Sequence, residues 1–117
     1  EVTNSNSTMS DTNICFEYDK SDLSMDASSQ IRSLANFLKS NNSSKVTIEG
    51  HCDERGTREY NLALGERRAN SVKDLLILNG VNSKKIRTVS YGEEKPAVSG
   101  SNESAWSKNR RAIVKVY

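Results

Sequence analysis

Two hydrophobic patterns run through the chain, and together they predict its secondary structure. Alternating apolar and polar residues are typical of strands, and apolar residues three and four positions apart are typical of amphipathic helices. The strands are predicted near residues 14–18, 46–50, 86–91 and 113–117, and the helices near 27–38 and 61–79. This order predicts a single α/β domain (an α+β two-layer sandwich) with both helices packed on one face of a small sheet.

Residues that favour caps and turns mark the ends of these elements. Ser24 or Asp26 can cap the first helix, and the polar run 41–44 ends it. Gly80 follows the second helix and is a natural C-terminal stop. The segment 92–109, which holds the only proline, is predicted as a loop or a short helix.

Composition narrows the class of protein. Residues 1–11 are rich in Ser, Thr and Asn, so we expect a flexible lead or tether before one domain at 12–117. The 17 Lys and Arg nearly balance the 15 Asp and Glu, for a net charge of +2, and no nucleic acid is expected as a partner. The longest apolar run, 75–78, is too short to span a bilayer.

Candidate chemistry lies between the second strand and the second helix, at residues 49–68. At helical spacing one stripe of that helix, next to the apolar one, carries Asn61, Leu64, Gly65 and Arg68. We expect Gly65 to leave open space beside Arg68, with Asp53 and Arg55 in the loop facing the same groove. On spacing alone, the favoured interpretation is a structural salt bridge between Asp53 and Arg68 that orders the loop.

This segment also resembles a known family. The run GHCDERGTREYNLALGERRANSV at 50–72 is similar to the signature of OmpA-like peptidoglycan-binding domains, closest to those of the Pal group of peptidoglycan-associated lipoproteins. FEYDKSDL at 16–23, VSYGEEKPAV at 89–98 and SKNRRAIVKVY at 107–117 resemble further blocks of that group. The likeness covers about residues 12–117 and implies a mixed four-stranded sheet.

The resemblance implies non-covalent binding of the peptide stem of peptidoglycan, and no enzyme activity or cofactor. The ligand group is meso-diaminopimelate, whose side-chain end carries an ammonium and a carboxylate. Asp53 is implied to bind the ammonium and Arg68 the carboxylate. These roles suit the two side chains, because a carboxylate only accepts hydrogen bonds and a guanidinium offers paired N–H donors that match a carboxylate. The further residues implied to line the groove are Tyr18, Asp19, His51, Arg55, Thr57, Asn61 and Leu64, with Arg111 as a weaker candidate.

The resemblance also implies partners and a location. It implies an outer-membrane lipoprotein on the periplasmic face, acting in the Tol–Pal system in envelope integrity and cell division, with TolB as a partner and the domain itself a monomer. The alternative is an OmpA-like domain of a porin tail or a flagellar stator with the same groove. Cys15 and Cys52 lie inside the expected fold, so we expect the lipid anchor to lie outside this sequence.

Two cysteines and one aromatic depart from the family pattern. A Cys15–Cys52 disulfide in an oxidising periplasm is one hypothesis, since both residues lie towards the carboxyl ends of strands and close to the groove. Two small buried thiols are the other. Trp106 stands where the Pal block usually has tyrosine and is expected to be a core or edge aromatic.

Two distant alternatives centre on His51. It could bind a metal with Cys52 and Asp53, but consecutive side chains near a strand point to opposite faces, so no metal site is expected. It could act as the base of a hydrolase with a Cys or Ser nucleophile, but the sequence offers no orienting partner or oxyanion loop.

Overall fold

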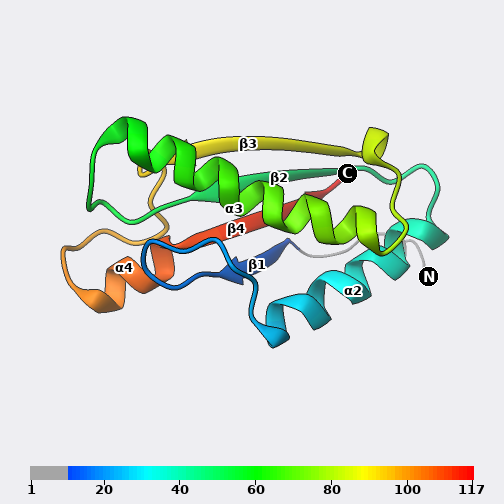
Figure 1. Ribbon diagram of the computed structural model, residues 1–117, viewed down its shortest axis with the longest axis horizontal. Helices are drawn as coiled ribbons and strands as arrows, with labels where there is room; N and C mark the ends of the chain where they lie inside the picture. Colours follow the sequence, from blue (N-terminus) through cyan, green and yellow to red (C-terminus); the bar gives the residue numbers. More distant parts are fainter. Residues whose placement is uncertain (1–10) are drawn as a thin grey trace.

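The computed structural model describes residues 11–117, which form one sheet and its covering helices (Figure 1). The elements are β1 (Thr12–Cys15), α2 (Met25–Ser40), β2 (Val46–His51), α3 (Arg58–Leu78), the 3₁₀ turn η1 (Ser83–Lys85), β3 (Ile86–Gly92), α4 (Glu103–Asn109) and β4 (Arg111–Val116). The predicted α+β fold with a mixed four-stranded sheet is confirmed. The predicted lead at 1–11 lies, apart from Asp11, outside the described residues.

The strands are ordered β1-β4-β2-β3. The inner pair β2 and β4 is antiparallel, β1 is antiparallel to β4, and β3 runs parallel to β2. β1 and β2 therefore point the same way, so the loops that follow them leave the sheet at the same end. This arrangement builds the site, and it could not be read from the sequence pattern.

The hydrophobic core lies between the sheet and the two long helices. In Figure 1, α3 runs along the sheet and α2 packs near its C-terminal end. The core residues alternate along the strands and follow helical spacing in the helices, as predicted. Fully buried members include Ile48, Val114, Leu34, Leu38 and Leu76.

Both long helices have side-chain caps. The predicted cap Ser24 accepts a hydrogen bond from Ala27 N at 3.1 Å. The second helix begins three residues earlier than expected, because Thr57 caps it by accepting from Tyr60 N at 3.1 Å. Gly80 has φ +99° directly after the C-cap, as a helix stop requires.

The first strand is shorter than predicted, ending at Cys15. Phe16 still donates its N–H to Arg110 O at 3.0 Å, but the chain then turns, and Asp19 adopts φ +58°. The apolar alternation extends to Tyr18, but this side chain is exposed and lines a pocket beyond the strand instead of the core. Among residues 11–117, no helix has the length and apolar character needed to cross a membrane.

Candidate functional site

A small pocket opens where β1 and β2 end and α3 begins. Its walls come from the loop after β1, the loop after β2 and the first three turns of α3. The lining residues are Tyr18, Asp19, Cys52, Asp53, Arg55, Gly56, Tyr60, Asn61, Leu64 and Arg68. The structure therefore brings together seven of the ten residues that the sequence predicted for the groove.

Arg68 is a buried cation at the floor of this pocket, 1% exposed. Its guanidinium donates to three backbone carbonyls: Nε to Lys20 at 2.8 Å, Nη1 to His51 at 2.9 Å and Nη2 to Glu17 at 3.1 Å. Burial lowers the pKa of Arg68 from its ordinary value. A guanidinium has five N–H donors, so within the described residues one N–H on each of Nη1 and Nη2 is left for a ligand.

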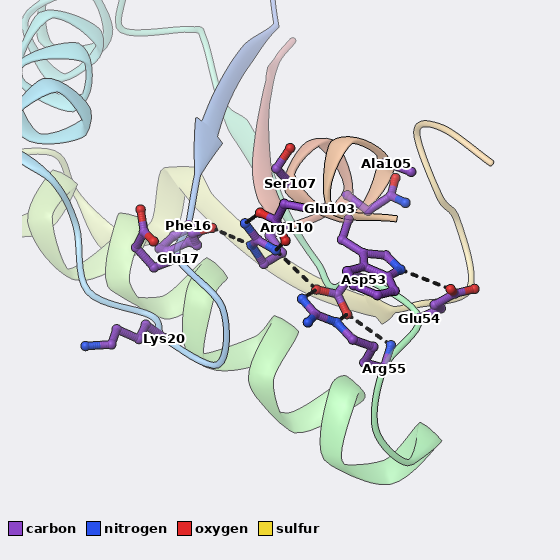
Figure 2. Close-up of polar contacts among 12 residues, drawn as sticks. Phe16, Glu17, Lys20, Asp53, Glu54, Arg55, Glu103, Ala105, Ser107 and Arg110 are labelled. Carbon is purple, nitrogen blue, oxygen red and sulfur yellow. Dashed lines mark hydrogen bonds and ion pairs between the residues drawn. The ribbon is translucent and has the colours of Figure 1, made fainter. Parts of the chain in front are cut away.

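Asp53 lies in the same pocket and is 4% exposed. Arg55 binds it with three donors: its backbone N and Nε reach Oδ1 at 3.0 and 3.2 Å, and Nη2 reaches Oδ2 at 2.8 Å. Arg110 Nη1 lies 3.5 Å from Oδ2. Burial alone would raise the pKa of Asp53, but these hydrogen bonds and positive charges outweigh burial and lower it. Figure 2 shows the carboxylate between the two arginines.

The predicted salt bridge between Asp53 and Arg68 is wrong. Among residues 11–117, the ion pairs of Asp53 are to Arg55 and Arg110, and Arg68 is held by carbonyl oxygens. The two side chains come from different elements and each reaches a nearer partner. The acid and the cation therefore share one pocket without neutralising each other directly.

Arg55 lies between two aromatic rings. Its Cζ is 4.0 Å from the centroid of Tyr18 and 3.9 Å from the centroid of Trp106. Trp106 in turn donates its indole N–H to Glu54 Oε2 at 3.0 Å. Trp106 comes from α4, so this short helix reaches the site through the arginine that binds Asp53.

The prediction that Arg111 lines the groove is wrong, and its neighbour Arg110 reaches the site instead. Neighbouring residues at the start of a strand point to opposite sides. Arg110 donates Nε to Phe16 O at 3.0 Å and Nη2 to Glu103 Oε2 at 2.9 Å, and pairs with Asp53. Arg111 instead donates to the carbonyls of Asn109 and Lys95.

His51 and Thr57 do not line the groove either. The side chain of His51 and the side chain of Ile48 lie on opposite faces of the sheet. On its own face, His51 Nε2 is 3.1 Å from Glu49 Oε1 and the ring stacks on Tyr91. Only its carbonyl serves the pocket, through Arg68. Thr57 acts as the N-cap of α3.

The proposed disulfide is not formed: Cys15 is an exposed free thiol and Cys52 a buried one. β4 lies between β1 and β2, so the two cysteines are separated by two strand spacings of about 4.8 Å each. That separation exceeds the Cα–Cα distance of roughly 7 Å that a disulfide can bridge. Cys52 Sγ instead donates to Asn61 O at 3.2 Å. Burial raises the pKa of the Cys52 thiol to about 11.

The expectation that Gly65 leaves open space is also wrong. A Cβ at Gly65 would overlap Ser90 Oγ and lie 2.9 Å from Gly50 O. The missing side chain lets α3 approach β2 closely, and this approach holds Arg68 and Asn61 at the pocket.

Five further residues complete the site, and the sequence reasoning did not assign them there: Glu54, Gly56, Tyr60, Trp106 and Arg110. Tyr60 is on the first turn of α3 and its hydroxyl donates to Asp19 Oδ1. The helical stripe that contains Asn61 and Leu64 could have indicated Tyr60, one position earlier. Trp106 and Arg110 reach the site only through the tertiary fold, so no local signal marks them.

Comparison with known proteins agrees with this architecture. The OmpA family model matches residues 15–110. The chain is 50% identical over 100 residues to the peptidoglycan-associated lipoprotein of Pseudomonas putida, covering 86% of the chain and 60% of that protein. It is 50% identical over 101 residues to the protein of the same name from Haemophilus influenzae, covering 86% and 66%. The chain thus spans about three fifths to two thirds of these relatives.

Solved structures show the same fold. The crystal structure of the peptidoglycan-associated lipoprotein from Burkholderia pseudomallei superposes with a TM-score of 0.88 at 38% identity, covering 90% of this chain and 89% of that one. The OmpA-like domain of FopA1 from Francisella tularensis gives 0.79 at 30% identity, covering 92% and 70%. The C-terminal domain of Helicobacter pylori MotB gives 0.83 at 21% identity, covering 91% and 84%, and shares the fold. The chain belongs to the OmpA family.

Proposed function

We propose that this domain binds the peptide stem of peptidoglycan without catalysing a reaction, through the zwitterionic end of meso-diaminopimelate. The observation that carries the proposal is the pair of buried, oppositely charged groups in one pocket, Asp53 and Arg68. Arg68 has N–H donors available on both terminal nitrogens and binds the ligand carboxylate bidentately. Asp53, an acceptor with a lowered pKa, binds the ammonium.

The names of the relatives support this ligand class. Proteins about 50% identical to the chain are called peptidoglycan-associated lipoproteins, and the match extends through the pocket residues. Their name also supports a periplasmic site of action for this domain, attached to the outer membrane through a lipid anchor. The pocket is small, and its polar groups suit the end of one side chain better than a polysaccharide ring.

Affinity for a single stem is expected to be modest. A hydrogen bond to a charged group contributes about 1.5–3 kcal/mol, and association costs at least about 4 kcal/mol. Three or four such bonds contribute about 5–12 kcal/mol, so after the association cost the net is at most about −8 kcal/mol, and binding of one stem is expected to be micromolar or weaker. A membrane-tethered domain on a polymer that repeats the ligand gains from effective concentration, so weak single contacts still hold the wall.

In the cell, this domain is proposed to link the outer membrane to the wall as the Pal component of a Tol–Pal system, supporting envelope integrity and division. TolB is the proposed protein partner, and the domain is proposed to act as a monomer.

The test is an NMR titration with a soluble meso-diaminopimelate stem peptide beside its lysine counterpart, which lacks the side-chain carboxylate. We expect shifts at Asp53, Asn61 and Arg68 with the first peptide and much weaker binding of the second. Arg68→Lys, which keeps the charge and loses the fork, is expected to weaken binding at least tenfold. Arg87→Lys, an exposed position on β3, is the matched control. Equal binding of both peptides would rule out the zwitterion assignment.

A further inference from the structure

The carboxylate of Asp53 has no vacant acceptor position in the structure. A carboxylate offers about four lone-pair positions. Three of them receive N–H groups of Arg55, and Arg110 lies against the fourth at 3.5 Å. Two guanidinium charges also repel an incoming cation. A ligand ammonium can therefore reach Asp53 only if one of these arginines withdraws.

Arg110 is the fixed member of the pair. Its side chain is 7% exposed, and it is also bound by the carbonyl of Phe16 and by Glu103. These contacts join the loop after β1 to α4, so moving Arg110 would disrupt three elements. Figure 2 shows these bonds converging on Arg110 from different segments.

Arg55 is the movable member. Its side chain is 30% exposed, whereas that of Asp53 is 4% exposed, so Arg55 covers the carboxylate on the solvent side. Apart from Asp53, the contacts of its guanidinium in residues 11–117 are the faces of Tyr18 and Trp106. Ring faces hold a guanidinium less tightly than buried carbonyls hold Arg68, and they allow it to slide.

We propose that Arg55 is an internal competitor for the ligand ammonium at Asp53, and that Trp106 sets how strongly it competes. The inference rests on the proposed function and adds a step to it. The stem binds by exchanging the side chain of Arg55 for its own ammonium, while Arg110 stays in place. The rings of Tyr18 and Trp106 stabilise the ligand-free form, in which Arg55 covers Asp53. They therefore lower the observed affinity of the domain for the stem.

This role predicts an unusual direction for the change in binding affinity when Trp106 is truncated. Trp106 does not line the pocket, so a merely structural or supporting role predicts that truncating it leaves binding unchanged or weakens it. Competition predicts the opposite, because removing one ring face frees Arg55. One cation–π contact at a partly exposed site corresponds to about a twofold to fivefold change in binding.

The experiment compares the wild-type chain with Trp106→Leu and Trp106→Tyr by calorimetry with the meso-diaminopimelate stem peptide. We expect Trp106→Leu to bind twofold to fivefold more tightly. Trp106→Tyr, which restores a ring face, is expected to bind like the wild type. Thermal unfolding of each variant shows whether α4 stays folded. Tyr117→Leu, an exposed aromatic at the end of the chain, is the matched control and is expected to change nothing.

Two spectroscopic signals follow the exchange directly. The Nε–H resonance of Arg55 should shift on binding as it leaves Asp53, and the emission of Trp106, the only tryptophan, should change with the same midpoint. If the stem binds while both signals stay still, or if Trp106→Leu binds more weakly, competition is refuted and the proposed function survives. If the stem does not bind the wild type at all, the proposed function fails, and this inference fails with it.

Discussion

Gly50 on β2 and Gly65 on α3 meet backbone to backbone. A Cβ at Gly50 would overlap the carbonyl of Gly65, and a Cβ at Gly65 would lie 2.9 Å from Gly50 O. Helix and strand thus approach more closely than any pair of side chains would allow. Because Asp53 follows β2 and Arg68 lies one turn beyond Gly65, this contact fixes the spacing between the acid and the cation of the pocket.

Gly65→Ala should destabilise the domain, by about 1–3 kcal/mol, because the added methyl overpacks the helix–strand contact. The sign is informative, since Gly→Ala inside a helix otherwise stabilises by about 1 kcal/mol. Chemical denaturation measures the change. Glu66→Ala, at the exposed next position of the same helix, should stay within about 0.5 kcal/mol of the wild type. A stabilised Gly65→Ala would mean that the contact is looser than described.

The two thiols should differ sharply in reactivity. Cys15 is exposed, and Cys52 is buried with a pKa of about 11. At pH 8 roughly one Cys52 thiol in a thousand is ionised. Alkylation of the native protein should therefore label Cys15 quickly and Cys52 only after unfolding. Mass spectrometry of the peptides distinguishes them, and rapid labelling of both would contradict the burial of Cys52.

The pKa of His51 should lie below its ordinary value of 6.5 in the folded protein. Burial, then the positive charge of Arg111, lowers its pKa from an ordinary value of 6.5, and the opposing contact with Glu49 does not restore it. In the unfolded chain the ring protonates near pH 6.5, so stability contributed by His51 is present above that pH. It is lost as the pH falls from there through the lowered folded pKa.

His51 is the only histidine, so its ring proton signals titrate without overlap. We expect an NMR midpoint below 6.5 in the folded protein. Unfolding curves of the wild type and of His51→Gln should converge towards acid pH. A midpoint above 6.5 would show that Glu49 dominates the environment of the ring.

Asp53→Asn should lower both binding and stability. The variant leaves the buried donors of Arg110 and Arg55 with a neutral partner, which is expected to cost about 1–3 kcal/mol. The pKa of Asp53 is lowered, so its contribution is present above its ordinary value of 3.8 and is lost as the pH falls through the lowered folded pKa. The stability gap between wild type and Asp53→Asn should thus begin to narrow below about pH 4. Denaturation at several pH values measures it, and a gap that stays constant from neutral pH down to about pH 2 would contradict this account.

Local features of this protein could be predicted well from its sequence. The helix α2, its cap at Ser24 and its buried stripe depend on neighbouring residues, and all three match. The pocket residues on one stripe of α3 were found for the same reason, since Asn61, Leu64 and Arg68 share a helix face. Helical spacing carries this information within a single element.

Errors arose wherever two distant segments decide the outcome. The order β1-β4-β2-β3 separates Cys15 from Cys52 by a strand, and no local pattern reveals that order. Gly65 looked like open space because its neighbour Gly50 comes from another element. The choice between Arg110 and Arg111 depends on where β4 begins, and a shift of one residue reverses which side chain reaches the site.

The direction of β1 has a mechanical consequence. The chain enters the sheet at Thr12 and reaches the pocket only beyond Cys15, so the two lie at opposite ends of the strand. With the proposed lipid anchor on the amino-terminal side of β1, tension between the membrane and the wall runs along this strand. Its backbone bonds to β4 are loaded side by side in shear and share the force, instead of opening one after another. Arg68 adds two bonds to the loop just past the strand, so the residue that holds the wall also resists its pull.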